Sequence, residues 1–226
     1  MNYHNITKSD MLNGTGLRVV LWVSGCSLHC KNCHNPQTWS PDSGICFDDD
    51  AKQELFEELE KDYISGITFT GGHPLERCNV YEILRLTKEI REKFPEKTIW
   101  VYTGYALEDL IFWNIISEEA YIKDVMEVLQ TIDVLVDGRY VDELRDPKLH
   151  WVGSSNQRVI DTKATLAKLD MEYIKESFGD NKSPGNSTTY DHDGISRYVA
   201  NAIVLKESIH YEDEPCSDYK TCGCGE

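Results

Sequence analysis

Four short apolar segments, separated by segments of helical periodicity, constrain the fold of this chain more than any other feature. The apolar segments are LRVVLWVS at 17–24, GITFT at 66–70, TIWVYT at 98–103 and IDVLVDG at 132–138. Between them, apolar residues recur at helical spacing over 48–63, 79–94 and about 107–129. Strands that alternate with helices predict a parallel sheet with the helices packed outside it.

The chain length limits how far such a sheet can close. A closed eight-stranded α/β barrel takes about 250 residues, and here residues 164–226 of a 226-residue chain lie outside the alternating pattern. We therefore expect an α/β fold in the form of a partial, open parallel β/α barrel over residues 1–163. A C-terminal extension over 164–226 is expected to hold a helix at 163–179, a flexible linker at 181–194, an apolar patch at 198–205 that adds a strand or a helix, and a cysteine-containing tail.

Charge and hydropathy exclude several classes of partner. The formal net charge is -16 and the pI is near 4.8, which disfavours binding to nucleic acid phosphates or to an anionic membrane surface. No apolar run approaches the roughly 18 residues of a membrane helix, and the N-terminus does not resemble a signal peptide. We expect a cytoplasmic protein, in which cysteines are kept reduced and clustered ones favour metal or redox sites.

Three cysteines, Cys26, Cys30 and Cys33, form a C-x3-C-x2-C pattern directly after the first predicted strand. Thiolates select zinc, copper(I) or an iron-sulfur cluster over metals that prefer oxygen. The spacing leaves three alternatives open: a zinc site completed by His34, a cluster, or cysteines without a metal. A structural zinc takes four protein ligands, whereas a [4Fe-4S] cluster held by three cysteines leaves one iron open for another ligand.

Two further loops are expected beside the cysteines. In a parallel sheet the strand-to-helix loops gather at the carboxyl ends of the strands, and here TGGHP follows the second predicted strand and TGY the third. Paired glycines, Gly71 and Gly72, let the backbone approach a ligand closely. The three loops together predict a ligand site at this edge.

The combination resembles the radical S-adenosylmethionine (radical SAM) enzymes, whose hallmark is C-x3-C-x2-C after the first strand and a glycine-rich turn after the next. The resemblance implies a partial barrel of the radical SAM type and a [4Fe-4S] cluster on Cys26, Cys30 and Cys33. It also implies that S-adenosylmethionine binds the open iron through its methionine end. The family usually has an acidic residue third in the turn, where this chain has His73.

A closer resemblance, over residues 1–163, is to the activating enzymes of anaerobic (class III) ribonucleotide reductase. It is carried by NGTGLRVVLWVSGC, CHNPQTW, GITFTGGHPL, PEKTIWVYTGY, IDVLVDGRY and WVGSSNQRVID. The DGRY and GSSNQRVID blocks separate this family from pyruvate formate-lyase activases, which share CHN after the third cysteine. The resemblance does not cover the tail, where Cys216, Cys222 and Cys224 leave open a second metal site or a flexible terminus.

The resemblance implies a function, cofactors and partners. The reduced cluster cleaves S-adenosylmethionine, and the 5'-deoxyadenosyl radical takes hydrogen from a glycine of the reductase large subunit to form a glycyl radical. An electron donor such as flavodoxin or ferredoxin is expected. The alternatives are the activation of another glycyl-radical enzyme such as pyruvate formate-lyase, a small-molecule substrate as in 7-carboxy-7-deazaguanine synthases, and a non-enzymatic zinc-binding interaction module.

The resemblance also implies which residues surround the cofactor. No side chain is expected to act as an acid or base, because the chemistry takes place at the cluster. The residues expected to bind the cofactor are Asn32, Cys33, His34, Gly71, Gly72, His73, Thr103, Gly104 and Asp137.

Overall fold

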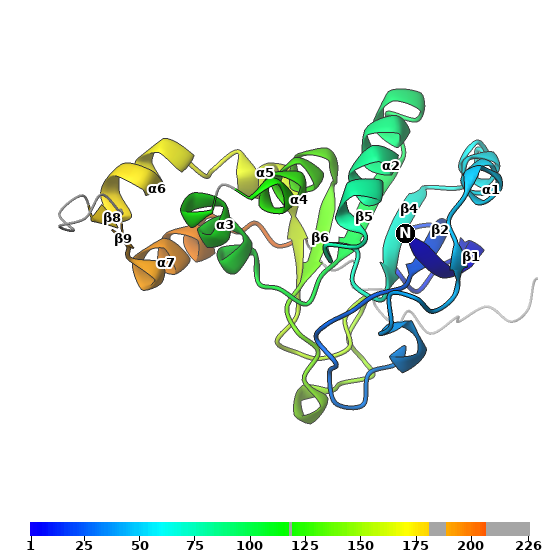
Figure 1. The fold of residues 1–226 in the computed structure, drawn as a ribbon, viewed down its shortest axis with the longest axis horizontal. Coiled ribbons are helices and arrows are strands. Elements are labelled where there is room, and N and C mark those ends of the chain that lie inside the picture. The colour runs from blue at the N-terminus through cyan, green and yellow to red at the C-terminus, as the bar shows by residue number, and fades with distance from the viewer. Residues whose placement is uncertain (118, 181–188, 207–226) are drawn as a thin grey trace, which may run out of the picture.

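The structure is a computed structural model that describes residues 1–117, 119–180 and 189–206. Its main sheet contains seven strands, which are β1 (Asn2–Asp10), β2 (Arg18–Val23), β3 (Ile45–Cys46), β4 (Gly66–Gly71), β5 (Thr98–Tyr102), β6 (Val134–Asp137) and β7 (Arg158–Asp161). They lie in the order β3-β1-β2-β4-β5-β6-β7 (Figure 1). The first and last strands of this order do not pair, so the expected open α/β architecture is confirmed.

The sheet is parallel only in its centre. Strands β2, β4, β5 and β6 pair in parallel, whereas β1 and β7 join the two sides antiparallel, as does β3 at the far edge. The expectation of a parallel sheet is therefore wrong at the edges. The reason is the connections: residues 11–17 between β1 and β2 are too few for the crossover that a parallel pair requires.

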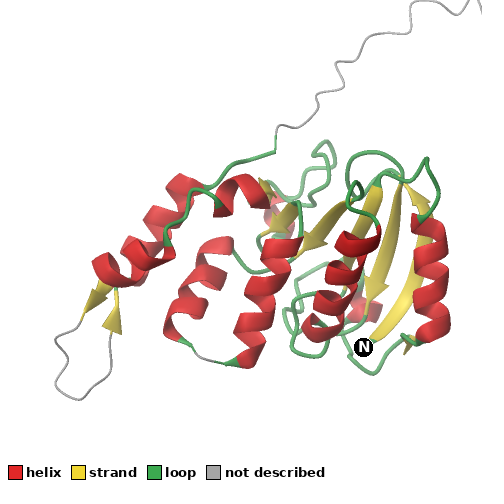
Figure 2. Ribbon diagram, turned by 90° about the horizontal axis from the view of Figure 1, so that it is seen from above, coloured by secondary structure: helices red, strands yellow, loops and turns green. Residues whose placement is uncertain are grey.

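The helices of the alternating pattern cover one face of this sheet (Figure 2). They are α1 (Asp49–Leu59), α2 (Val80–Lys93), α3 (Leu107–Ile116) and α4 (Ala120–Thr131). Alternate strand residues, such as Leu21, Phe69 and Val101, share one core cluster with apolar residues of these helices. The period of two along the strands and the helical spacing between them produce this layer.

The opposite face of the central strands carries a smaller apolar cluster. Trp100, Val134 and Val136 are buried there against Trp151 and other partly buried side chains. Because the residues of each strand alternate between the two faces, both faces of the central strands are covered.

The predicted helix over about 107–129 is two helices. Helix α3 ends at Ile116, and Ser117 has an extended backbone with φ of -125°. Helix α4 then begins at Ala120. Tyr121 in its first turn donates a hydrogen bond of 2.8 Å to the Leu75 carbonyl, which holds the start of α4 beside the loop after β4.

The C-terminal extension contains more regular structure than expected. It begins within α5 (Thr162–Leu166) and includes α6 (Met171–Phe178), the paired strands β8 (Gly179–Asp180) and β9 (Thr189–Tyr190), and α7 (His192–Ala202). The helix expected over 163–179 is thus broken, because Asp170 caps a new helix by accepting a hydrogen bond from the Tyr173 amide.

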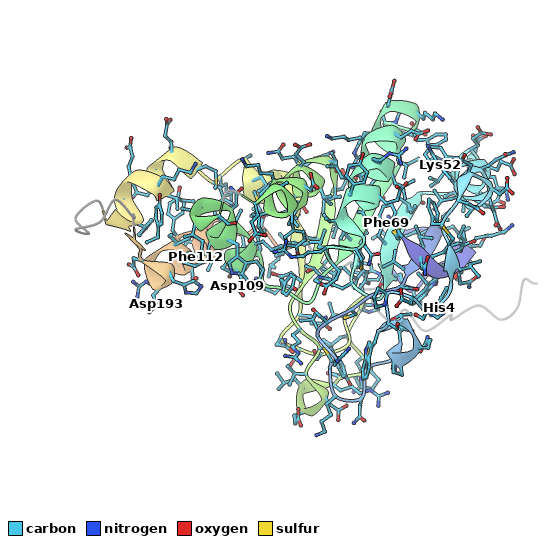
Figure 3. The ribbon with its side chains drawn as sticks, in the orientation of Figure 1. His4, Lys52, Phe69, Asp109, Phe112 and Asp193 are labelled. Carbon is cyan, nitrogen blue, oxygen red and sulfur yellow. The ribbon has the colours of Figure 1, made fainter. Side chains whose placement is uncertain are left out.

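Helix α7 packs on α3 and occupies part of the segment expected to be a linker. Figure 3 shows Asp109 and Phe112 of α3 beside Asp193 at the start of α7, and the Phe112 and His192 rings are 4.5 Å apart. After α7 the chain returns to the sheet, where the Lys206 amide donates to the Val159 carbonyl at 2.9 Å.

Part of the predicted extension lies outside the described residues. This holds for residues 181–188 of the expected linker and for the tail cysteines Cys216, Cys222 and Cys224. The domain boundary expected after residue 163 stays a prediction. Among the helices that the structure describes, none is long and apolar enough to span a bilayer.

Candidate metal centre and cofactor site

The loops after β2, β4, β5 and β6 lie together at the carboxyl ends of the parallel strands. Backbone hydrogen bonds join them: the Gly72 amide donates to the Val23 carbonyl and the His73 amide to the Gly25 carbonyl, both at 2.8 Å. The Thr103 amide donates to the Val136 carbonyl at 2.8 Å. The predicted meeting of cysteine loop and glycine turn at this edge is confirmed.

The cysteine loop, residues 25–33, carries Cys26, Cys30 and Cys33 as free, half-buried thiols. The Cys26 amide donates to the Trp39 carbonyl at 2.9 Å, and the Cys33 amide donates to the Cys30 carbonyl at 3.2 Å. Burial raises the pKa of the Cys26 thiol, so a bound metal has to displace its proton.

The donor set of this loop fits an iron-sulfur cluster. It offers three soft thiols, and the Asn35 amide donates to the Cys33 sulfur at 3.4 Å, the kind of contact that tunes cluster potentials. Within the described residues, no three His, Cys, Asp or Glu side chains gather closely enough to hold a single metal ion. The case for a cluster therefore rests on the chemistry of the three thiols and on the position of their loop at the carboxyl ends of the strands.

Gly72 in the glycine turn is required by close packing. A Cβ atom there would lie 2.8 Å from the Gly25 carbonyl oxygen and 2.9 Å from that of Val23. Gly71 before it has a left-handed φ of 96°, which a side chain rarely adopts. Both glycines thus let the cysteine loop and the end of β4 lie in direct backbone contact.

His73 points inward and uses both ring nitrogens within the protein. Its Nδ1 lies 2.9 Å from the Glu76 carboxylate, and its Nε2 lies 2.8 Å from the Thr103 hydroxyl. The His73 ring holds the pKa of Glu76 at about 2, against an ordinary 4.5, and groups of Ser27 act in the same direction against the effect of burial. Glu76 was missed from the sequence, although it lies three residues after His73.

Asn32 and His34 flank the third cysteine on the exposed surface of the loop. The Asn32 side-chain amide donates to Asp142 at 2.7 Å, and its backbone is left-handed with φ of 54°. Asparagine tolerates this conformation better than most residues. The structure therefore shows a loop-shaping role for Asn32, and cofactor contacts of Asn32 and His34 stay predictions.

Gly104 and Asp137 line one cavity of about 380 Å³ at the ends of β5 and β6. A Cβ atom on Gly104 would lie 2.1 Å from a methyl carbon of Leu28. The fully buried Asp137 carboxylate accepts hydrogen bonds from the Leu107 amide at 2.9 Å and from Arg158 at 2.9 and 2.5 Å. These contacts give Asp137 a structural role at the start of α3.

The loop after β6 holds the outer side of the cysteine loop through three polar contacts. Arg139 donates to the Leu28 carbonyl at 2.5 Å, Lys31 pairs with Glu143 at 2.7 Å, and Asn32 bonds Asp142 as above. Figure 1 shows the two loops side by side below the sheet. The two carboxylate acceptors, Asp142 and Glu143, belong to the short 3₁₀ helix η2 (Asp142–Leu144).

The sequence block around Gln157 supports this loop after β6. The Gln157 side-chain nitrogen donates a hydrogen bond to the Gly138 carbonyl, and the Gln157 side-chain oxygen accepts one from the Gly153 amide, both at 2.9 Å. Asn156 donates to the Arg139 carbonyl at 2.8 Å. The GSSNQ and DGRY segments thus form one unit against the cysteine loop.

Comparison with known proteins places the chain in a family. A family model described as a 4Fe-4S single cluster domain matches residues 12–160. An anaerobic ribonucleoside-triphosphate reductase-activating protein of Enterobacteria phage T4 is 42% identical over 159 residues, which are 70% of this chain and 93% of that protein. The chain belongs to this family of activating proteins.

Bacterial members of the activating-protein family show the same coverage. The protein of Escherichia coli K12 is 42% identical over 161 residues, which are 70% of this chain and 97% of that protein. That of Haemophilus influenzae is 39% identical over 159 residues, 70% and 96% of the two chains. The family resemblance inferred from the sequence is confirmed, and the remaining 30% of this chain is additional to these relatives.

Proposed function

We propose that this protein activates an anaerobic ribonucleotide reductase by forming a glycyl radical on its large subunit. The observation that carries the proposal is the packing of the C-x3-C-x2-C loop on the glycine turn, in a chain of the activating-protein family. A reduced [4Fe-4S] cluster held by the three cysteines would supply one electron to bound S-adenosylmethionine, which would give methionine and a 5'-deoxyadenosyl radical able to take the glycine hydrogen.

Cys26, Cys30 and Cys33 are the proposed cluster ligands. The backbone of Gly71 and Gly72 is the proposed contact for the methionine end of S-adenosylmethionine, because both glycines stay partly exposed at the end of β4 and pack beside the cysteine loop. The remaining contacts are proposed for the residues around them: Asn32, His34, His73, Thr103, Gly104 and Asp137.

The side chains of three of these residues are already engaged within the protein. His73 and Thr103 bond one another, and Asp137 bonds Arg158 and the Leu107 amide. We therefore expect their part in cofactor binding to come from shaping the loop backbone.

The sheet supports a partial barrel of the radical SAM type, with the C-terminal extension beginning after residue 163. The open edge of such a barrel leaves room for a protein loop to reach the site. A flavodoxin or ferredoxin is the proposed electron donor, and the cytoplasm the proposed location, since clustered free thiols suit a reducing compartment.

The test is anaerobic reconstitution with iron and sulfide, followed by a reductant and S-adenosylmethionine. The proposal expects brown protein that forms 5'-deoxyadenosine, and a glycyl radical signal in electron paramagnetic resonance once the reductase is added. Pyruvate formate-lyase serves as the control substrate and is expected to gain no radical. Colourless protein that binds zinc and forms no 5'-deoxyadenosine contradicts the proposal.

A further inference from the structure

A chain of three side chains links the loops after β4 and β5 beside the cysteine loop. Glu76 contacts His73 Nδ1 at 2.9 Å, and His73 Nε2 contacts the Thr103 hydroxyl at 2.8 Å. His73 is 1% exposed and Thr103 is 5% exposed. Burial on this scale excludes water as a competing partner for the ring.

The direction of the hydrogen bonds in this chain follows from chemistry. An ionised carboxylate only accepts hydrogen bonds, so His73 Nδ1 carries a hydrogen and donates a hydrogen bond to the Glu76 carboxylate. Thr103 in turn accepts a hydrogen bond from the Tyr105 amide at 3.2 Å. The His73 ring is further held edge-on against the Tyr105 ring, with centroids 4.6 Å apart, and these contacts fix the orientation of the Glu76 carboxylate.

The Glu76 carboxylate faces the start of the cysteine loop. Ser27, which directly follows Cys26, lines the same cavity as Glu76, and hydrogen bonding from its side chain and backbone helps to lower the pKa of Glu76. On the other side of Cys26, the Gly25 carbonyl accepts from the His73 amide at 2.8 Å. The residues on both sides of Cys26 are thus held by one short segment, 73–76.

We propose that Glu76, oriented by His73, is a positioning residue that fixes the Cys26 end of the cysteine loop in the protein without its cluster. His73 then acts through Glu76, and its ring does not contact S-adenosylmethionine. The inference rests on the proposed ligand role of Cys26, and it gives the histidine at the third position of the glycine turn a role within the protein.

Two substitutions at His73 separate its two contacts. In His73→Asn the side-chain nitrogen occupies the δ position and can still donate to Glu76, whereas in His73→Gln it occupies the ε position and reaches only Thr103. Glu76→Ala removes the carboxylate. Glu119→Ala is the matched control, because Glu119 lines the same cavity of about 440 Å³ as Glu76 and Ser27 but pairs with the exposed Arg77.

The first readout is hydrogen exchange of residues 25–33 in the protein without metal. We expect exchange about tenfold faster in Glu76→Ala and His73→Gln, because local opening becomes easier. His73→Asn and Glu119→Ala are expected to exchange within about twofold of the wild type. The second readout is iron retained after anaerobic reconstitution and gel filtration, which should fall in the same two variants.

The proposal is overturned if His73→Asn and His73→Gln behave alike, or if Glu76→Ala matches Glu119→Ala in both readouts. Neither readout requires S-adenosylmethionine cleavage. If the wild type binds iron but forms no 5'-deoxyadenosine, the proposed function fails while the exchange results still decide the role of Glu76.

Discussion

The left-handed backbones of His29 and Asn32 bend the loop that carries the three cysteines. Their φ values are 44° and 54°, so the chain turns at two points within the eight-residue motif. Cys26 lies at the fixed end of the loop, between backbone contacts to Trp39 and to the segment after β4. At this scale the site is a set of thiols held by polar contacts from neighbouring loops.

Substitution of a single cysteine tests the ligand assignment. Cys30→Ala is expected to lose most of the iron and sulfide that the reconstituted wild type retains, because a cluster is held by its thiolates. Cys46→Ala is the control, since Cys46 is an exposed residue of the edge strand β3. Iron analysis and visible absorption measure the result, and equal loading of the two variants would rule out Cys30 as a ligand.

The Glu76 carboxylate makes the stability of the metal-free protein depend on pH in the acid range. Its folded-state pKa of about 2 lies below the ordinary value of 4.5, so the unfolded chain binds this proton more readily. Its contribution is complete above about pH 4.5 and is lost as the pH falls toward 2; it is on the order of 3 kcal/mol. Urea unfolding from pH 6 to 3 measures the part that is lost over this range, about 2 kcal/mol.

Glu76→Gln is expected to flatten this pH dependence, because the amide does not titrate. Glu96→Gln, which alters an exposed glutamate in the loop before β5, serves for comparison. If Glu76→Gln keeps the full wild-type slope, the ionised carboxylate does not stabilise the fold.

At the scale of elements, the sequence predicted the four central strands and the helices α1 and α2 well. Their periodicity is strong, and Asp48 caps α1 by accepting from the Ala51 amide at 3.0 Å. It did not predict β1 as a strand, because residues 2–10 are mostly polar and pair with β2 and with the short edge strand β3. Nor did it predict the break between α3 and α4, where apolar residues continue through Ile116.

The candidate site shows the same limit. Spacing alone located the three cysteines and the two glycines, because these features are local. The pairing of Asn32 with Asp142, and that of Asp137 with Arg158, join segments far apart in the chain. A single sequence contains no signal for such pairs, so the roles expected for Asn32 and Asp137 missed these structural contacts.

Arg158 of β7 joins this strand to β6 and α3 through two ion pairs. It donates to Asp137 and to Glu108, and these two carboxylates raise its pKa. Arg158→Ala would leave the buried Asp137 charge without its partner, so we expect a loss of about 3 kcal/mol in the free energy of unfolding. Denaturant titration measures the loss.

Arg85→Ala provides the matched arginine control for this measurement. Arg85 pairs with Glu82 on the exposed side of α2 at 3.1 Å, and exposed pairs contribute about 0.5 kcal/mol. If Arg158→Ala lowers the free energy of unfolding as little as Arg85→Ala does, the ion pairs of Arg158 do not stabilise the fold.

At the scale of the whole molecule, the extension absent from the compared relatives shares its core with the rest of the protein. Ile195 and Val199 of α7 are fully buried and belong to the same apolar cluster as the sheet and α3. The extension also pairs with the outer edge of the sheet at Lys206. The net charge of the chain is -16. Because the extension and the sheet share one apolar core, we expect the molecule to unfold as one unit.

Ile195→Ala tests this shared core. The cavity is expected to cost about 3 kcal/mol and to shift one cooperative transition, followed by fluorescence of the tryptophans in the sheet. Arg197→Ala, an exposed position of the same helix, should leave the midpoint unchanged. Two separate transitions, with the sheet unaffected by Ile195→Ala, would show that the extension folds independently.

The central claim is that this protein transfers a hydrogen atom from a glycine of its reductase to the 5' carbon of S-adenosylmethionine. It is tested most directly with reductase labelled with deuterium at the glycine α-carbons, reduced activating protein and unlabelled S-adenosylmethionine. The account predicts one deuterium in the 5'-deoxyadenosine that forms, measured by mass spectrometry. Formation of 5'-deoxyadenosine without deuterium, or none at all with the cluster fully loaded, would contradict it.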